Sequence, residues 1–400
     1  LKYSTYKKNL KVKKMVNVIV LGLVSFFTDL SSEMVYPLIP LYLTSVLGAT
    51  PVIVGIIEGI AESLASLLKV YSGYISDRSQ KKKTIAFAGY ATGLVYKLAL
   101  ILAGSWTGVL FARVIDRFGK GIRTAPRDVM VAECANEKNR GLTFGIHKML
   151  DMAGSALGIL LAYILLRYYG DSSYLTVFYV SIIPMLCALA MFAFIRQKKE
   201  VIISGQREPF WKNIRGLNNQ LKLYLIVAFL FTLGNSSNAF LLLKATATGI
   251  SNQNVLLLYF IYNGVASIFA IPFGRLSDKI GRKHLLVLGY SVFTMTYLIF
   301  AFSSNSLMIV LGFVIYGLYT ALISGAEKAF IAEIAPQTLK GTMLGLHATL
   351  VGISLLPASI IAGLLWKNVG SFAPFLFGAI LSLAATIVLQ VGMVNKRDEK

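Results

Sequence analysis

The sequence predicts an all-α integral membrane protein whose twelve transmembrane helices form two pseudo-symmetric bundles of six. Three observations support this fold class: the composition, a series of long apolar segments, and an internal repeat. Hydrophobic residues make up 56% of the 400 residues, charged residues 14%, and the mean hydropathy is +0.69. A soluble chain carries about 25% charged residues. A chain this apolar lacks the polar surface that a soluble fold needs.

The apolar segments give the number of spans. A helix that crosses a bilayer needs about 20 mostly apolar residues. Twelve segments meet this requirement, at 15–47, 51–75, 84–104, 106–133, 141–168, 174–195, 221–247, 253–274, 284–302, 305–333, 341–366 and 371–394.

The positive charges give the orientation. The net charge of +21 comes from 39 Lys and Arg against 18 Asp and Glu. If the N-terminus is inside, 27 of these bases fall on cytoplasmic segments, three on outer segments and nine within spans. Cytoplasmic loops carry such an excess of Lys and Arg, and anionic lipid attracts them. We therefore expect a plasma-membrane protein (the bacterial inner membrane) with both termini cytoplasmic, and no nucleic-acid partner.

An internal repeat relates the two halves of the chain. Gly73-Tyr-Ile-Ser-Asp77-Arg78 recurs 201 residues later as Gly274-Arg-Leu-Ser-Asp278-Lys279, and Ala132-Glu133 recurs 200 residues later as Ala332-Glu333. Parallel six-span repeats are one plan of secondary transporters. The repeat predicts an N-terminal bundle over 1–196, a cytoplasmic linker over 197–220 and a C-terminal bundle over 221–400.

The loop motif in this repeat carries a family resemblance. Gly274 to Lys283 reads GRLSDKIGRK, and Gly73 to Lys83 reads GYISDRSQKKK, with Gln80 in place of a second glycine. Over its whole length the chain resembles a transporter of the major facilitator superfamily. The resemblance implies transport by alternating access. It also implies a conformational latch that stabilises the outward-facing state, formed by Gly73, Asp77, Arg78, Asp128, Gly274, Asp278, Lys279 and Arg282.

Charged residues within the spans are the candidate functional groups. A charge at membrane depth costs about 2.5–3.5 kcal/mol, so it needs a partner, water or a function. The first-half spans hold eight bases and seven acids, whereas the second half holds only Glu327, Lys328 and His347 at depth. One interpretation is a self-neutralising structural network.

A functional interpretation divides these groups into two sets. Acids at mid-depth are desolvated and can carry protons; the candidates are Asp29, Glu33, Glu62 and Asp116. A basic stripe follows span 4 at helical spacing, and arginine suits carboxylate or phosphate. The candidate substrate-binding residues are Arg113, Arg117, Lys120, Tyr36, Lys97, Asn235 and Asn263.

These features predict a proton-coupled transporter of a small organic solute, weighted toward an anion such as a carboxylate or a metal–carboxylate chelate. One alternative is proton-antiport efflux of amphipathic or cationic compounds. Another is a membrane receptor that transports nothing. The sequence shows no nucleophile arrangement and no Walker loop, so we expect neither an enzyme nor an ATP-driven pump. We expect no cofactor and no metal site. The expected partners are the substrate, protons and the lipid bilayer, and the expected state is a monomer.

Overall fold

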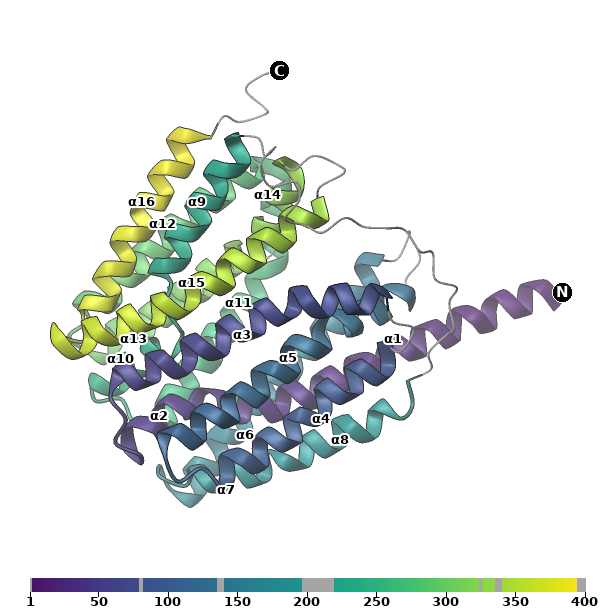
Figure 1. Ribbon diagram of the computed structural model, residues 1–400, viewed down its shortest axis with the longest axis horizontal. Coiled ribbons are helices and arrows are strands. Elements are labelled where there is room, and N and C mark those ends of the chain that lie inside the picture. Colours follow the sequence, from purple (N-terminus) through teal and green to yellow (C-terminus); the bar gives the residue numbers. More distant parts are fainter. Residues whose placement is uncertain are drawn as a thin grey trace. The chain divides into compact units, whose positions relative to one another are not determined.

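The computed structural model describes residues 2–78, 82–134, 140–195, 219–323, 326–334 and 340–393, and all regular secondary structure in these ranges is helical. Figure 1 shows the helices in chain order. They are α1 (Lys2–Val35), the 3₁₀ helix η1 (Tyr36–Leu38), α2 (Ile39–Ser45), α3 (Pro51–Arg78), α4 (Lys82–Ile101), α5 (Trp106–Cys134), α6 (Arg140–Tyr169), α7 (Tyr174–Val180), α8 (Ile182–Phe192), α9 (Asn219–Gly234), α10 (Ala239–Ala247), α11 (Asn252–Ile280), α12 (Arg282–Phe302), α13 (Ser306–Ile323), α14 (Ala326–Ile334), α15 (Lys340–Asn368) and α16 (Ala373–Gly392).

Within the described ranges, ten helical segments are long and apolar enough to cross a membrane. The chain is therefore a multi-pass membrane protein. The two other predicted spans coincide with α5 and α11, which are 29 residues long each. Helix α5 carries eight Asp, Glu, Lys or Arg residues, which sets it apart from the apolar helices. The count of twelve spans and the orientation of the termini remain predictions.

The chain divides into two compact units, which we describe separately. Unit 1 contains Leu1–Ile39 and Leu68–Ser204, and unit 2 contains Pro40–Leu67 and Gly205–Lys400. Helix α3 is shared, because its N-terminal part up to Leu67 groups with unit 2. Most of the predicted linker, 197–220, lies outside the described residues. The boundaries 1–196, 197–220 and 221–400 remain predictions.

In unit 1, glycines allow pairs of helices to approach closely. Helix α6 packs along α1, where Gly154 and Gly158 face the backbone of Phe26 and Leu30. Helix α4 packs along α5. There, a Cβ atom on Gly89 would lie 2.8 Å from the carbonyl oxygen of Gly119. Small residues at such contacts are typical of membrane helices. Helix α1 also contacts α5, so that α1, α4 and α5 lie around the site described below.

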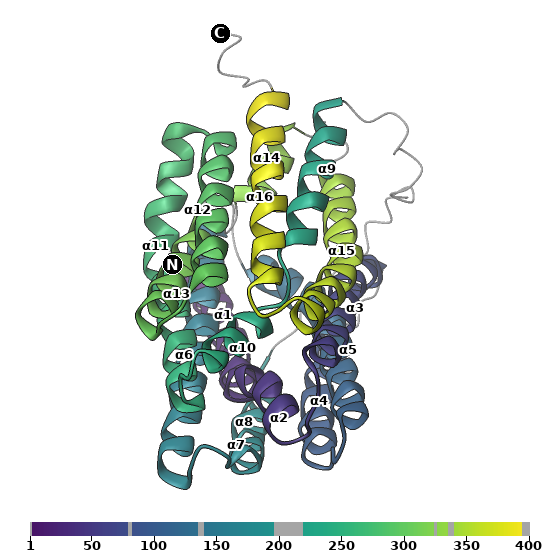
Figure 2. The same ribbon diagram turned by 90° about the vertical axis from the view of Figure 1, so that its left-hand side faces the viewer.

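In unit 2, α12 packs against α13 and α16, and α9 packs against α15 and α16 (Figure 2). Aromatic rings fill much of its interior. The rings of Phe231 and Tyr290 stack with centroids 3.9 Å apart, and those of Phe293 and Tyr297 with centroids 4.0 Å apart. This interior agrees with the apolar second half expected from the sequence.

Two predicted spans are interrupted near the middle. The first changes from α1 through η1 to α2 near Pro37 and Pro40, where the sequence predicts a kink. The seventh changes from α9 to α10 across the non-helical residues 235–237 and a turn at Asn238. In membrane proteins, non-helical backbone is tolerated where protein buries it or where it lines a water-filled cavity.

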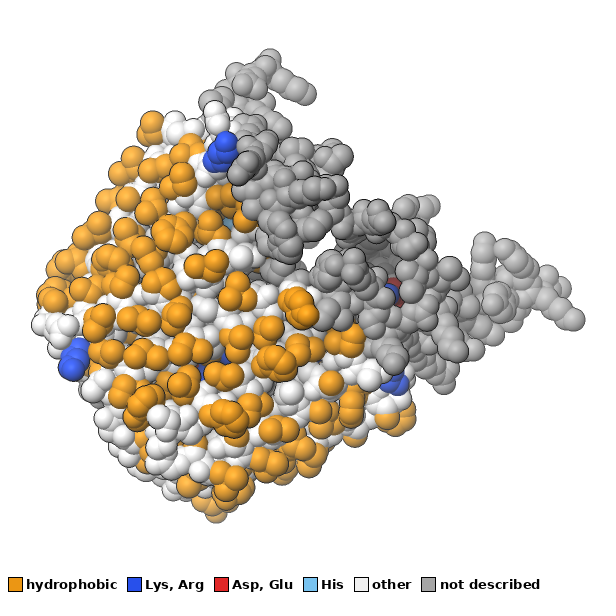
Figure 3. All heavy atoms as spheres, viewed as in Figure 1, with side chains coloured by type: hydrophobic (Ala, Val, Ile, Leu, Met, Phe, Trp, Pro, Cys, Tyr) orange, Lys and Arg blue, Asp and Glu red, His pale blue; other side chains and the backbone are white. Residues whose placement is uncertain are grey.

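The surface carries large apolar side chains, as a membrane protein requires. Figure 3 shows hydrophobic side chains spread over the described surface on one face, with few charged side chains among them. Leu102 is 83% exposed, Val391 81% and Phe111 64%. Contiguous exposed apolar surface of this kind marks contact with membrane or protein, and here it fits contact with lipid chains.

Candidate functional site

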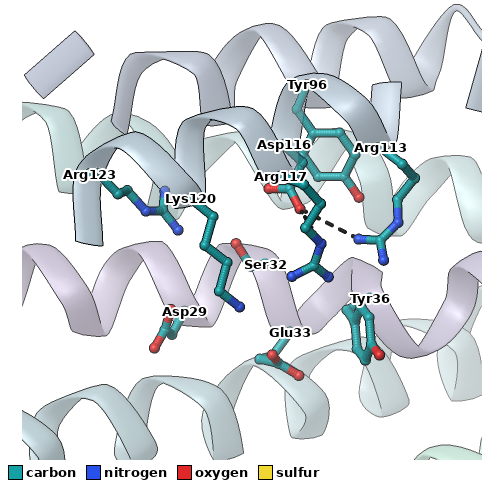
Figure 4. Close-up of a pocket in the computed structure, with 10 residues that line it drawn as sticks. All are labelled: Asp29, Ser32, Glu33, Tyr36, Tyr96, Arg113, Asp116, Arg117, Lys120 and Arg123. Atoms are coloured by element: carbon teal, nitrogen blue, oxygen red, sulfur yellow. Dashed lines mark hydrogen bonds and ion pairs between the residues drawn. The ribbon is translucent and has the colours of Figure 1, made fainter. Parts of the chain in front are cut away.

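A polar pocket lies in unit 1, between α1, α4 and α5, with η1 at one end (Figure 4). About 370 Å³ of this region is free of protein atoms, a volume that includes its opening to solvent. The residues that line it are Asp29, Ser32, Glu33, Tyr36, Tyr96, Arg113, Asp116, Arg117, Lys120 and Arg123. Seven of these ten residues are predicted site residues.

Helical spacing explains why these side chains face one another. On α5, Arg113, Arg117, Lys120 and Arg123 follow at intervals of four, three and three. From α1 into η1, Asp29, Ser32, Glu33 and Tyr36 follow at three, one and three. Residues three and four apart share one helix face. A basic face of α5 therefore opposes an acidic face of α1.

Asp116 holds two arginines at one end of the pocket. Its Oδ2 atom lies 3.4 Å from Nη1 of Arg113 and 3.5 Å from Nε of Arg117. The side chains of Arg113, Arg117 and Asp116 are 1%, 5% and 11% exposed. Two guanidinium groups therefore share one oxygen of a single carboxylate, at distances longer than the 2.7–2.9 Å of strong charge-assisted hydrogen bonds.

Tyr36 lies beneath the same two arginines. The Cζ atom of Arg113 is 5.2 Å from the centre of the Tyr36 ring, and that of Arg117 is 5.4 Å from it. A cation within about 6 Å of an aromatic ring is attracted to it. The ring from η1 therefore helps to fix the arginine pair that α5 presents.

The two acids of α1 face the bases further along α5. Asp29 is within electrostatic range of Lys120 and Arg123, and Glu33 of Lys120 and Arg117. Figure 4 shows the Lys120 side chain extending toward α1, between Asp29 and Glu33. With every group ionised, the pocket holds four positive and three negative charges. It can therefore accept one further negative charge without a net excess.

Lys97, a predicted substrate-binding residue, does not line this pocket. Its side chain is buried, with the residue 1% exposed, and its Nζ donates a hydrogen bond to the carbonyl oxygen of Ser31 at 2.8 Å. Lys97 thus links α4 to α1, while the neighbouring Tyr96 faces the pocket.

Three other predicted site residues lie in unit 2. Glu62 is on the part of α3 that groups with that unit. The amide of Asn235 donates to the hydroxyl of Tyr319 at 3.2 Å, and the amide of Asn263 donates to the carbonyl oxygen of Tyr259 at 2.8 Å. Both asparagines therefore contact tyrosine residues of unit 2.

Much of the predicted latch lies where side chains are not described. This applies to Gly73, Asp77, Arg78, Gly274, Asp278 and Lys279, all of which fall at the ends of α3 and α11. Of the remaining two, Arg282 begins α12. Asp128 pairs with Arg127, whose Nη2 lies 2.9 Å from its Oδ1. Nearby, Lys82 pairs with Glu133.

Three lining residues were not predicted as site residues: Ser32, Tyr96 and Arg123. Ser32 follows Asp29 by three residues and therefore lies on the same face of α1, so helical spacing could have predicted it. Arg123 extends the basic stripe of α5 by three residues. Tyr96 is one of several tyrosines within the spans that could line a pathway, and the sequence alone does not fix the rotation of α4 that turns it toward the pocket.

A multi-pass helical architecture with a charged pocket between its helices is typical of a membrane protein that carries a solute. The model of the Major Facilitator Superfamily matches residues 21–244 and 224–400. The chain belongs to this superfamily and is a membrane transporter, not an enzyme.

Relatives and solved structures agree with this assignment. The chain is 36% identical over 379 residues to an uncharacterized MFS-type transporter of Methanocaldococcus jannaschii. This alignment covers 93% of this chain and 94% of the relative. The chain is also 24% identical over 358 residues to the fosmidomycin resistance protein of Escherichia coli, in an alignment that covers 86% of both chains. A crystal structure of the nucleoside transporter NupG, in a mutant form, superimposes with a TM-score of 0.81 at 11% identity. It covers 94% of this chain and 100% of that one.

Proposed function

We propose that this transporter carries a small organic anion, a carboxylate or a metal–carboxylate chelate, together with protons. The observation that carries the proposal is the basic face of α5 in a polar pocket. Arg113, Arg117, Lys120 and Arg123 line it with Asp29, Glu33 and Asp116. Arginine presents a planar fork that matches an oxyanion. The excess of one positive charge favours an anion over a cation.

Proton coupling follows from the acids that compensate the basic face. Protonation of Asp29, Glu33 or Asp116 removes a negative charge from the pocket, which favours the binding of an anion. Proton and anion would then load together and leave together as the two halves alternate in access. Glu62 in unit 2 is a further candidate proton carrier, and Lys97, Asn235 and Asn263 are further candidate substrate contacts.

We infer a monomer with twelve spans in the plasma membrane, the bacterial inner membrane, with both termini cytoplasmic. The two bundles are 1–196 and 221–400, joined by the linker 197–220. The latch residues stabilise the outward-facing state rather than bind substrate.

Uptake into proteoliposomes tests the proposal. The assay uses radiolabelled lactate, benzoate and citrate, each with and without Mg²⁺, and compares an inward proton gradient with equal pH on both sides. We expect gradient-driven uptake of at least one anion. Arg117→Gln should reduce it at least tenfold, because it removes a guanidinium from the anion site. Arg167→Gln, at the exposed end of α6, is the matched control and should transport normally.

The proton part has its own test. Glu33→Gln and Glu62→Gln each remove a candidate proton carrier while keeping the size of the side chain. At least one of them should abolish the response to the pH gradient. If both variants respond to the gradient as the unmodified protein does, the proton-coupled part of the proposal is wrong.

A second candidate function is proton-antiport efflux of amphipathic or cationic compounds. The acids Asp29 and Glu33 in the pocket support it, as does the similarity to a protein named for fosmidomycin resistance. The two functions differ in their need for the basic face. An exporter of cations should still bind its substrate after Arg113, Arg117 or Lys120 is neutralised, whereas an anion carrier should not.

A further inference from the structure

Arg123 lies at the opposite end of the basic face of α5 from the arginine pair, Arg113 and Arg117 (Figure 4). It lines the pocket although the residue is only 6% exposed. In the part of the chain that the structure describes, Arg123 forms no ion pair within 4 Å, whereas the arginine pair shares Asp116. Asp29 and Asp116 lie further from Arg123, within electrostatic range. A buried cation is costly unless a partner or a ligand compensates it, so Arg123 has the capacity to bind an anion.

Helix α4 supports the Arg123 side chain without supplying a carboxylate. The Cζ atom of Arg123 lies 4.7 Å from the centre of the Tyr90 ring. Two glycines of α4 leave room beside it, since a Cβ atom on Gly89 would lie 2.7 Å from Cβ of Arg123 and one on Gly93 would lie 3.9 Å from its Nη1. The arginine pair lies near the ring of Tyr36 in a similar way. The basic face therefore presents guanidinium groups on two separate aromatic supports.

We propose that Arg123 is a second anion subsite, and that the substrate is a dianion, such as a dicarboxylate, with one anionic group at the arginine pair and the other at Arg123. This inference rests on the proposed function and deepens it, because it names the charge of the substrate and the separation of its charged groups. Arg123 follows Arg113 by ten residues and Arg117 by six. The average separation is about 12 Å along the helix axis, given a rise of roughly 1.5 Å per residue. A hydrogen bond of about 2.8 Å at each end leaves about 6 Å between the two anionic groups.

The charges of the pocket agree with a dianion. With every group ionised, the pocket holds four positive and three negative charges. One proton, taken up as in the proposed cycle, raises the net charge to +2, and a dianion then makes the pocket neutral. A monoanion would leave one positive charge, at the end of the pocket that it does not reach. The uncharged lining residues Ser32, Tyr36 and Tyr96 suit the uncharged middle of such a molecule.

Three ligands with one aromatic scaffold test the second subsite on the purified full-length protein. Benzoate, terephthalate and phthalate are each titrated at neutral pH and followed by the thermal unfolding midpoint, which rises when a ligand binds the folded state. Terephthalate and phthalate carry the same two charges, but only terephthalate holds its carboxylates on opposite sides of the ring. For the unmodified protein, we expect terephthalate to bind at least tenfold more tightly than either of the other two ligands.

Substitutions at Arg123 assign this preference to one residue. Arg123→Gln should lower the affinity for terephthalate at least tenfold more than the affinity for benzoate, because it removes the guanidinium that only the longer dianion reaches. Arg123→Lys keeps the charge but not the planar fork, and should keep part of the preference. Arg167→Gln, at the exposed end of α6, is the matched control and should bind all three ligands as the unmodified protein does.

Substitutions at Tyr90 answer the same question if Arg123→Gln does not fold. Tyr90→Leu removes the ring that supports Arg123 and should reduce the preference for terephthalate. Tyr90→Phe should keep it, because the Tyr90 hydroxyl is buried and has no hydrogen-bond partner among the described residues.

The outcomes separate this inference from the function on which it rests. If the unmodified protein binds terephthalate no more tightly than phthalate, or if Arg123→Gln keeps the preference, Arg123 is not a second subsite, while binding of benzoate would still support an anion carrier. If none of the three ligands binds the unmodified protein, the anion site itself is wrong, and the second subsite with it.

Discussion

Tyr36 illustrates how a single residue controls the geometry of the pocket. Its ring lies within 5.5 Å of two guanidinium groups that would otherwise repel each other. Each cation–π contact contributes about 0.5–2 kcal/mol. We therefore expect Tyr36→Leu to weaken benzoate binding about tenfold, because both arginines lose the surface that orients them. Titration of purified protein, followed by the unfolding midpoint, measures this.

The matched variant separates the ring from the hydroxyl group. Tyr36→Phe keeps the aromatic face and removes only the oxygen, so its affinity for benzoate should stay within about twofold of the unmodified protein. An equal loss in both variants would mean that the hydroxyl group, not the ring, supports the site.

Among single residues, the sequence predicted seven of the ten that line the pocket, and Lys97 is the one predicted proton-coupling or substrate-binding residue of unit 1 that does not line it. Charged residues at helical spacing identified Asp29, Glu33, Arg113, Arg117 and Lys120, because a charge within a span has few explanations. Lys97 was predicted on the same reasoning, but its partner is the carbonyl oxygen of Ser31. A backbone acceptor on another helix leaves no trace in the spacing of side chains, so only the structure reveals this hydrogen bond between α4 and α1.

Among the helices, the contact between α1 and α6 positions the acidic side of the pocket. Gly158 faces the backbone of Leu30, one residue from Asp29, and an added Cβ would overlap the carbonyl oxygen of Leu30. Overpacking a tight contact typically costs about 1–3 kcal/mol. We expect Gly158→Ala to lower the unfolding midpoint of the purified protein and to weaken anion binding, since α1 must move away from α6.

Gly264 provides the control for this prediction. It lies within α11, and no atom lies within 4 Å of an added Cβ. Alanine is favoured over glycine within a helix, so Gly264→Ala should leave the unfolding midpoint unchanged or raise it. If the two alanine variants were equally stable, the close approach of α1 and α6 would not limit stability.

Hydropathy predicted where helices occur better than where they are interrupted. The interruption at η1 had a signal in Pro37 and Pro40. The one between α9 and α10 had none as strong, because Asn235, Ser236, Ser237 and Asn238 are also found within membrane helices. There, the hydroxyl of Tyr316 donates to Oδ1 of Asn238 at 2.7 Å. The interruption between α9 and α10 is therefore accompanied by a contact with another helix, α13, and not by a strong helix-breaking residue.

For the whole molecule, composition and the internal repeat predicted a membrane protein of two helical bundles, and the loop motif carried the resemblance to the superfamily. The grouping of a long helix with its neighbours needs the structure. The repeat predicts a first bundle that contains all of the second span. In the structure, the part of α3 before Leu68 groups with unit 2, and Glu58 on it accepts a hydrogen bond from Ser237 at 3.4 Å. A linear sequence records which segments cross the membrane. It does not record which neighbour each half of a long helix contacts.

The distribution of Lys and Arg gives the last prediction, which concerns orientation in the membrane. With 27 bases on one set of segments and three on the other, insertion should leave the basic set in the cytoplasm. Single cysteines at Ser105, an exposed residue between α4 and α5, and at Ser204, in the predicted linker, report the two sides once Cys134 and Cys187 are replaced by alanine. In intact cells, a membrane-impermeant maleimide should label Ser105→Cys and leave Ser204→Cys unlabelled, and both should react after permeabilisation. The reverse pattern would place the basic segments outside. The net charge of +21 would then need an explanation other than topology.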